Sequence, residues 1–546
     1  MNISPITRLL NLLKLERRDL KILPVLIFGY GLISIATPVS VQALVNIVTM
    51  GSVLQPLFVV SIILFLLLAL SGALYIFESY IVELIQRRIF IRTAITTAQN
   101  ARGVEINLYD RENPVELINR FFDVTTVQKS AASLLTVGLT SLLQIFIGSL
   151  ILIFYSSFFS LFIFVIIGFL IFIVKSLGRH ATETAIKESK AKYEMAAWLE
   201  SIAKNIFAFK FYQGEDRAAT QTHALAKNYI KTRSKHFNIL LWQNISAAFI
   251  YAIGGTGLLA LGGGLVIKGE INLGQFVAAE LIIFGVLAAL IRLVNKLDYF
   301  YDLLAALDKI GVLEDMPQEQ CGAHTLEKIE LTSLKLNDVN FAYNSYIKPL
   351  NNIHFELNKG QSLAVLGNPG TGKSTLIKII TKLRTPSTGN ITLNQFDIRQ
   401  VDNNAIRNMM GFAGNIEIAQ GSIYENICLG RDISLDTFNT IINELGLAEE
   451  FNRFPDGAST AIAASGSPLS NSQLQRLMIA RAAVARPSLI MIDGLLDNFN
   501  EKELNAVMHM FKQHQQDWML IVTTRFAHIA KRFDQTLDLN DPESKK

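Results

Sequence analysis

The chain has 546 residues, of which 50% are hydrophobic and only 18% are charged. This length is too great for one hydrophobic core, so at least two domains are expected, and so apolar a composition argues against a soluble protein. The net charge of +4 is consistent with the lysines and arginines that flank membrane spans. We therefore expect membrane lipid, and no nucleic acid, as a partner.

Six apolar stretches each approach or exceed the roughly 20 residues that a helix needs to cross the hydrocarbon. They lie at about 22–47, 54–82, 131–155, 157–176, 240–267 and 273–295. The first is too long for the core of a cleaved signal peptide and should remain as an anchor. An all-α transmembrane domain of six long helices is therefore predicted for residues 1–312.

The connections between these stretches predict the orientation. The two long connections, 83–130 and 177–239, carry many lysines and arginines, whereas the three short ones are weakly charged. By the positive-inside rule, the long connections and both termini lie in the cytoplasm.

Polar residues fall within the predicted spans, among them Glu78, Gln144 and Glu280. A charge in hydrocarbon is costly unless it faces a cavity or a partner, so these residues are candidates for a substrate path. The alternative is that Glu78 and Glu280 lie near a membrane face or pair within the protein.

Hydrophobicity falls after residue 312, which predicts a polar linker over 313–333. From 334 to 546, short β-rich runs alternate with helical ones. This alternation is typical of an α/β domain with a largely parallel sheet. The sequence therefore predicts a multi-domain protein in which a helical membrane domain precedes an α/β domain.

The α/β domain contains a nucleotide-binding motif. Its sequence GNPGTGKS, at 367–374, matches GxxxxGK(S/T), and it follows an apolar strand and precedes a helical run. Glycines let backbone N–H groups surround the phosphates, while Lys373 reaches the β- and γ-phosphates and Ser374 coordinates Mg²⁺. The predicted ATP-binding residues of this segment are Gly367, Asn368, Pro369, Gly370, Thr371, Gly372, Lys373, Ser374 and Thr375.

A second motif supports the first. The run LIMID, at 489–493, predicts a buried strand that delivers Asp493 to the magnesium ion. We therefore expect ATP and Mg²⁺ as cofactors.

Between these motifs, LSNSQLQR at 469–476 resembles the LSGGQxQR signature of ATP-binding-cassette (ABC) domains. Tyr343 lies where that family stacks an aromatic ring on adenine. The resemblance extends over essentially the whole chain and implies a type I exporter fold, two subunits per transporter and two ATP molecules between the cassettes. The signature residues that would contact the partner's ATP are Leu469, Ser470, Asn471, Ser472 and Gln473.

The stretch around Arg120 most resembles bacterial exporters allied to haemolysin secretion. This narrower resemblance implies a bacterial inner-membrane location with a cytoplasmic cassette, a second half-transporter as partner, in a homodimer or heterodimer, and a periplasmic adaptor protein.

Several positions depart from the family's pattern. Gly494 stands where a catalytic carboxylate follows the strand aspartate, Thr524 stands where a histidine contacts the γ-phosphate, and Asn415 replaces a glutamine. Losing a positioned general base typically costs about 10²–10⁴ in rate. No catalytic residue of the family is intact, so the chain resembles a degenerate cassette with very weak intrinsic hydrolysis.

The signature and the D-loop are altered as well. Asn471 and Ser472 replace two glycines, and their Cβ atoms should crowd the partner's γ-phosphate and strain the backbone. Asn500 replaces the aspartate of the D-loop.

Three functions remain open. The first is an ATP-binding half-transporter that couples ATP to export of an unknown substrate beside a hydrolysing partner. The second is a non-hydrolysing membrane scaffold or regulator, in which ATP only holds cassettes together. The third is an active ATPase that uses another base, such as Asp497.

Overall fold

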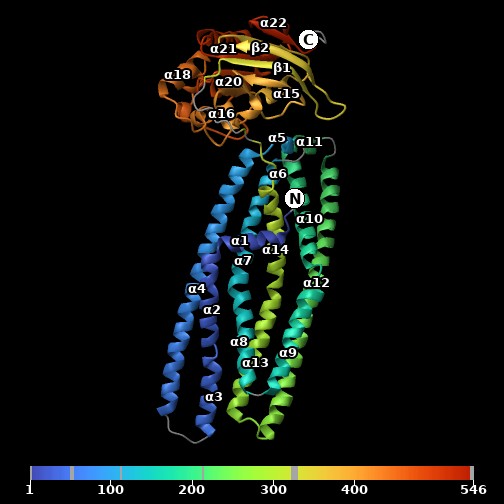
Figure 1. Cartoon of the computed structure of the whole chain (residues 1–546), viewed down its shortest axis with the longest axis vertical. Coiled ribbons are helices and arrows are strands. Elements are labelled where there is room, and N and C mark those ends of the chain that lie inside the picture. Colours follow the sequence, from blue (N-terminus) through green and yellow to red (C-terminus); the bar gives the residue numbers. More distant parts are fainter. Residues whose placement is uncertain are drawn as a thin grey trace. The chain divides into compact units, whose positions relative to one another are not determined.

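A computed structural model describes residues 3–49, 55–110, 114–155, 157–211, 214–320, 322 and 330–540. Contacts divide the chain into two units. One comprises Met1–Val104 with Leu108–Gln318, and the other comprises Glu105–Asn107 with Glu319–Lys546. The first is built from long helices and the second from helices and strands, as the sequence predicts (Figure 1).

The long helices of the first unit run along one common direction in Figure 1. In chain order, its helices are α1 (Pro5–Leu15), α2 (Arg17–Ile33), α3 (Ala36–Thr49), α4 (Gln55–Gly103), α5 (Ile106–Tyr109), α6 (Pro114–Asn119), η1 (Arg120–Phe122), α7 (Asp123–Ser133), the π-helix η2 (Leu134–Gly138), α8 (Leu139–Tyr155), α9 (Ser157–Phe172), the π-helix η3 (Ile173–Leu177), α10 (Ala181–Lys204), α11 (Ile206–Lys210), α12 (Gly214–Ile267), α13 (Leu273–Asn295) and α14 (Leu297–Glu314).

Within the described residues, five helical segments are long and apolar enough to cross a membrane. They are Arg17–Thr49, Gln55–Gly103, Glu116–Phe154, Gly214–Ile267 and Leu273–Glu314. The predicted span at 157–176 falls on a helix pair, Ile163–Leu177 and Ala181–Lys204, which meets at a bend of 45°. Counted as one span, this pair brings the number to six.

The bend has a local cause at Gly178, the last residue before the turn into α10. A Cβ atom there would lie 2.4 Å from the carbonyl oxygen of Val174 and 2.6 Å from the hydroxyl of Tyr301. Glycine therefore lets the chain turn where a larger residue would collide.

Large apolar side chains point outward along the membrane helices. On α4, for example, Phe58, Phe65 and Ile76 are each about 70% exposed. Such a surface is unfavourable in water but stable against lipid, because the helices satisfy their backbone hydrogen bonds internally. The first unit is therefore a membrane domain.

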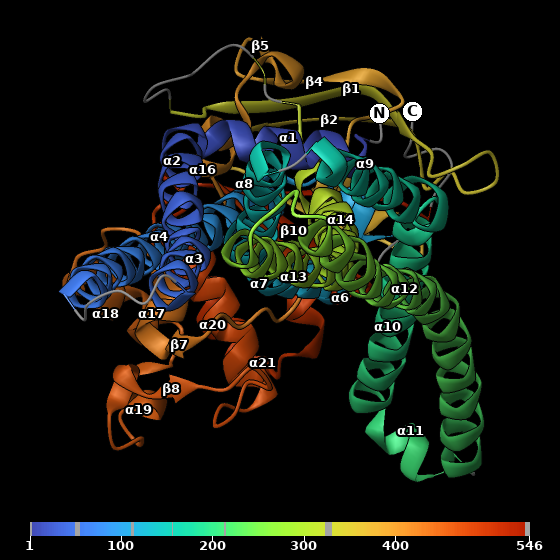
Figure 2. The ribbon, with the colours of Figure 1, turned by 90° about the horizontal axis from the view of Figure 1, so that it is seen from below.

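Helix α11 and the ends of α10 and α12 that it joins form an arm that projects from the remaining helices of this unit (Figure 2). Polar pairs hold the helices of the arm to one another. Arg233 Nη1 on α12 donates to Glu188 Oε2 on α10 at 3.1 Å, and Trp198 Nε1 donates to Thr222 Oγ1 at 3.0 Å.

The described residues of the second unit form three sheets. The strand order is β2-β1-β4-β5 in an antiparallel sheet, β11-β3-β10-β9-β6 in a parallel sheet and β7-β8 in a two-stranded sheet. The strands are β1 (Ser333–Phe341), β2 (Leu350–Asn358), β3 (Ser362–Leu366), β4 (Thr388–Leu393), β5 (Phe396–Asp397), β6 (Met410–Ala413), β7 (Gly421–Ser422), β8 (Ala461–Ile462), β9 (Leu489–Asp493), β10 (Met519–Thr524) and β11 (Gln535–Asp538).

The helices of this unit follow the strands in the alternation expected of an α/β domain. They are α15 (Lys373–Ile380), η4 (Ile398–Gln400), α16 (Asn403–Asn408), α17 (Ile423–Cys428), α18 (Leu435–Glu444), α19 (Ala448–Phe451), η5 (Gly457–Ser459), α20 (Asn471–Ala483), η6 (Leu495–Asn498), α21 (Glu501–Gln513) and α22 (Ala527–Ala530). The Cys428 thiol on α17 is buried and free, and Cys321 lies outside the described residues.

The parallel sheet decides where the functional residues meet. All six residues of β10 are buried, as is typical of a strand covered on both faces. β10 lies between β3 and β9, and Thr524 pairs with Leu366 while Thr523 pairs with Asp493. The carboxyl ends of these three strands therefore share one edge of the sheet, which is where ligands bind in such folds.

Candidate nucleotide site

The segment between β3 and α15 forms a tight loop over this edge. Gly370 and Gly372 adopt positive φ angles of 87° and 100°. A Cβ atom on Gly372 would lie 2.9 Å from the carbonyl oxygen of Pro349, so both conformation and space require glycine there. The exposed residues Asn368, Pro369 and Gly370 form the rim of the loop.

The loop is closed by hydrogen bonds to its own carbonyls. Lys373 Nζ donates to Gly367 O at 2.6 Å and to Asn368 O at 2.9 Å, and Thr371 Oγ1 donates to Asn368 O at 2.9 Å. Burial lowers the pKa of the Lys373 ammonium, and the charges of Asp497 and Asp493 oppose this effect. The ammonium thus lies within the loop, near two carboxylates.

The two predicted magnesium ligands lie on neighbouring elements. Ser374 is exposed on the first turn of α15, and Asp493 ends β9, where its Oδ1 accepts a hydrogen bond from Thr523 Oγ1 at 2.7 Å. One hydroxyl and one carboxylate suit Mg²⁺, which takes few protein ligands and completes its shell with water and phosphate oxygens. Within the described ranges, no cluster of three His, Cys, Asp or Glu side chains offers a metal site without phosphate.

Tyr343 is held beside the same loop. Its hydroxyl lies 3.0 Å from Thr375 Oγ1. The Phe341 ring packs edge-on against it, with 5.0 Å between the ring centroids, and the Arg384 guanidinium lies 4.7 Å from the centroid of the Tyr343 ring. The side chain nevertheless remains 43% exposed. Its ring is therefore fixed in orientation while part of it stays open to a ligand.

The positions that depart from the family's pattern have different surroundings. Gly494 is left-handed, with a φ angle of 70°. Thr524 is fully buried, and its hydroxyl donates to the carboxylate of Asp497. The backbone N–H of Arg525 donates to Asp497 Oδ2 at 3.2 Å. Asn415 is exposed on the loop after β6.

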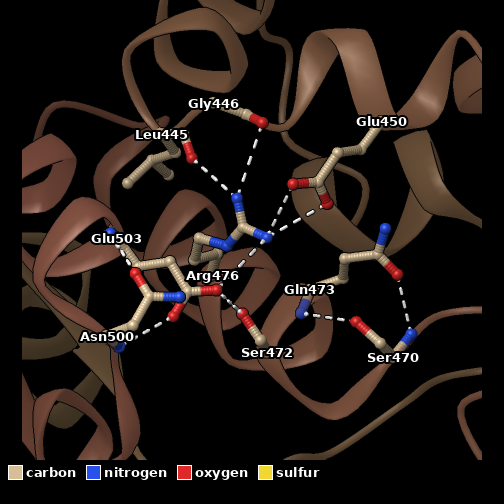
Figure 3. Close-up of polar contacts among 9 residues, drawn as sticks. All are labelled: Leu445, Gly446, Glu450, Ser470, Ser472, Gln473, Arg476, Asn500 and Glu503. Atoms are coloured by element: carbon tan, nitrogen blue, oxygen red, sulfur yellow. Dashed lines mark hydrogen bonds and ion pairs between the residues drawn. The ribbon is translucent and has the colours of Figure 1, made fainter.

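The signature residues lie at the start of α20 (Figure 3). Leu469 is buried, and Ser470 caps the helix in a reciprocal pair with Gln473, in which each side chain accepts from the other's backbone N–H. Asn471 and Ser472 occupy the first helical turn and are not among the described residues with positive φ. The predicted backbone strain is therefore wrong, because helical φ and ψ angles suit any residue with a Cβ atom.

Ser472 belongs to a polar network that the sequence analysis missed. Its hydroxyl donates to Glu503 Oε1, and Glu503 Oε2 accepts from the backbone N–H of Asn500 at 3.0 Å (Figure 3). The Asn500 side chain accepts from the Glu503 backbone N–H at 2.9 Å, which completes a capping box on α21. The pattern Asn500-x-x-Glu503 is the local signal that could have identified this pair.

Arg476 anchors the other side of the network. Its Nη2 atom lies 2.9 and 3.0 Å from the two carboxylate oxygens of Glu450, and Nη1 donates to Leu445 O at 3.2 Å. The guanidinium also lies 3.9 Å from Glu503 Oε1. The last residue of LSNSQLQR thus connects α20 with both α19 and α21.

Comparisons with known proteins agree with this arrangement. Residues 350–496 match the family described as ABC transporter, and residues 20–290 match the ABC transporter transmembrane region. The chain belongs to the ABC transporter family. It is an integral membrane protein, and the predicted fold class, a helical membrane domain followed by an ABC ATPase domain, is confirmed.

Relatives place this ABC transporter chain among exporters. It is 25% identical over 519 residues to an export ATP-binding/permease protein of Rickettsia bellii (strain RML369-C), covering 92% of this chain and 89% of that protein. It is 28% identical over 276 residues to the alpha-hemolysin translocation ATP-binding protein HlyB of Escherichia coli O157:H7, covering 50% of this chain but only 39% of HlyB. A bacterial Atm1-family ABC exporter shares the fold, with a TM-score of 0.83 at 18% identity over 96% of this chain and 93% of that one.

The polar residues of the membrane domain have three different environments. Glu78 is 2% exposed and contacts the Thr140 side chain. Gln144 Oε1 accepts from Arg292 Nη2 at 2.7 Å. Glu280 lines a cavity of about 340 Å³ between α12 and α13. Pairing within the protein therefore explains how the membrane domain accommodates the polar side chain of Gln144, but it does not explain Glu280.

Proposed function

We propose that this chain is the ATP-binding half of an exporter in a bacterial inner membrane, with its cassette and both termini in the cytoplasm. The observation that supports this most directly is the shared sheet edge, where the phosphate loop, Asp493 and Thr524 meet in a chain that also carries a membrane domain. In this proposal the membrane domain is 1–312, the linker 313–333 and the cassette 334–546.

ATP binding is assigned to the residues that the structure brings together. Lys373 would exchange its two loop carbonyls for phosphate oxygens, while Tyr343 would stack on the base. Ser374 and Asp493 would hold Mg²⁺, which neutralises charge on the β- and γ-phosphates. Helix α15, which begins at Lys373, adds the positive end of its dipole beneath the phosphates.

Hydrolysis is assigned mainly to a partner half-transporter. Gly494 offers no side chain to activate water, and the Thr524 hydroxyl is directed to Asp497. Asp497 itself accepts from Thr524 and from the Arg525 N–H, so its lone pairs already serve the protein. This arrangement disfavours Asp497 as a replacement base, because both of its carboxylate oxygens already accept hydrogen bonds from the protein.

A second candidate is a non-hydrolysing scaffold or regulator, in a homodimer that ATP holds together. The observation in its favour is that the side chains of Ser472, Asn500 and Thr524 all form hydrogen bonds with other residues of the cassette. In either case the signature residues on α20 would face the partner's ATP. The resemblance to exporters allied to haemolysin secretion also implies a periplasmic adaptor as a further partner.

Separate assays of ATP binding and turnover test these proposals. The full chain is purified in lipid nanodiscs, alone and with a candidate partner, and both a fluorescent ATP analogue and phosphate release are measured. We expect binding that Lys373→Ala abolishes, and turnover only with the partner. Absence of binding at millimolar analogue would refute the proposal, and strong Lys373-dependent turnover by the chain alone would refute the division of labour.

A further inference from the structure

The cavity beside Glu280 lies between two membrane helices, α12 and α13, in the domain shown in Figures 1 and 2. Its volume is about 340 Å³. The residues that matter here are Tyr251 and Gly255 on α12 and Phe276, Glu280 and Phe284 on α13. Three aromatic rings and one carboxylate thus line a space inside an apolar span.

The depth of Glu280 makes its charge expensive. Helix α13 begins at Leu273, at the short turn that we place outside the cytoplasm, and a helix rises about 1.5 Å per residue. Glu280 therefore lies roughly 10 Å along the helix, within the hydrocarbon region. An unpaired carboxylate at such a depth costs several kcal/mol unless a cation or water compensates it.

No residue of the described ranges supplies that cation. The ion pairs found there leave Glu280 without Lys, Arg or His within 4.0 Å, and no hydrogen bond to its carboxylate is formed. Arg292 lies on the same helix, roughly 18 Å further along it, and donates to Gln144. The charge of Glu280 is thus available to a ligand.

The aromatic rings are brought into place by glycines. A Cβ atom on Gly255 would lie 3.1 Å from the Phe284 ring, and one on Gly262 would lie 2.7 Å from the Phe276 ring. The Tyr251 and Phe284 ring centroids are 5.9 Å apart. Close approach of the helices at these glycines therefore packs two rings of α13 against α12, beside the carboxylate.

We propose that this cavity binds an organic cation with a hydrophobic body, such as an aryl or alkyl quaternary ammonium. The carboxylate compensates the charge, and the faces of Tyr251, Phe276 and Phe284 attract the cation and cover its apolar part. If the chain is an exporter, as proposed above, the ligand belongs to its substrate class. A quaternary ammonium fits better than an inorganic ion, because Glu280 is the one carboxylate of the lining and aromatic and aliphatic side chains make up most of the rest.

The test uses the full chain in nanodiscs and benzyltrimethylammonium as the probe. Binding is measured by titration calorimetry without ATP, with empty nanodiscs as the blank. We expect saturable binding that weakens about tenfold or more in Glu280→Gln. The matched control is Glu270→Gln, which removes the same charge from the exposed turn before α13 and should bind as the natural chain does.

A second variant separates the cavity from the charge. Phe284→Leu retains Glu280 but removes a ring, and it should weaken the probe several-fold without affecting ATP-analogue binding, which serves as the folding control. Neopentylbenzene, the neutral carbon isostere of the probe, should not displace it.

Three outcomes would overturn the proposal: no saturable binding, equal affinity in the Glu280→Gln and Glu270→Gln variants, or displacement by the neutral isostere. They would show that lipid fills the cavity, that a partner subunit covers Glu280, or that charge plays no part. Because the assay contains no nucleotide, each outcome leaves the proposed ATP-binding function to be judged by its own experiment.

Discussion

Restoring a glutamate at position 494 should, by itself, recover little ATP hydrolysis. A positioned general base contributes about 10²–10⁴ in rate. Gly494, however, has a φ angle of 70°, a conformation that costs a residue with a Cβ atom about 1–2 kcal/mol. Since about 1.4 kcal/mol corresponds to a tenfold change, the backbone alone removes a factor of roughly 5–30 from the possible gain.

The remaining gain also depends on neighbours that the single change leaves unaltered. Thr524 stays bonded to Asp497, so no side chain from the end of β10 contacts the γ-phosphate. Asn471 and Ser472 of the facing copy still carry Cβ atoms at its other side. We therefore expect Gly494→Glu to raise turnover less than about tenfold, and the combination with Thr524→His, Asn471→Gly and Ser472→Gly to exceed the product of the separate gains.

The assay is phosphate release by the purified chain in nanodiscs. The blank for each variant is a second protein that combines the same change with Lys373→Ala. Gly494→Ala is the matched control, because it has the same backbone cost and no carboxylate. The structure leaves space for either side chain, since a Cβ atom on Gly494 would meet no atom within 4 Å. A rise of about 100-fold with Gly494→Glu alone, sensitive to Lys373→Ala, would refute this reasoning.

Three further predictions concern binding, stability and orientation. Lys373→Ala should abolish binding of an ATP analogue at millimolar concentration, whereas Lys531→Ala on the exposed surface should not. Arg476→Met should destabilise the cassette by about 3–5 kcal/mol, because Glu450 loses its buried partner. Thermal unfolding followed by fluorescence should show a clear decrease in Tm for this variant, but not for the exposed control Arg453→Met. In intact cells, an impermeant maleimide should label a cysteine at position 270 but not one at 110, and the opposite pattern would contradict the orientation.

The sequence was sufficient for features that depend on local pattern. Long apolar runs predict membrane helices because lipid requires both length and hydrophobicity. The phosphate loop is equally local: Gly372, Lys373 and Ser374 perform their roles through backbone geometry within a few residues. The alternation of strands and helices was also enough to predict the parallel sheet.

What the sequence could not supply depends on contacts between distant residues. Thr524 and Asp497 are 27 positions apart, and Ser472 and Glu503 are 31 apart, so nothing local indicates that they meet. The expected strain at Asn471 was wrong because the structure begins α20 at that residue, and a signature motif alone does not specify where the helix begins. The cavity at Glu280 likewise depends on how closely two helices pack.

Three of the positions that depart from the family's pattern, Ser472, Asn500 and Thr524, have hydrogen-bond partners within the cassette. Ser472 and Asn500 both bond to Glu503, and Thr524 bonds to Asp497. Each of these three polar groups is therefore satisfied within the protein, as buried polar groups generally are. These bonds join α20 to α21 and β10 to η6. These hydrogen bonds give all three positions a structural role inside the cassette that does not depend on hydrolysis, which agrees with the proposal that this chain binds ATP while a partner hydrolyses it.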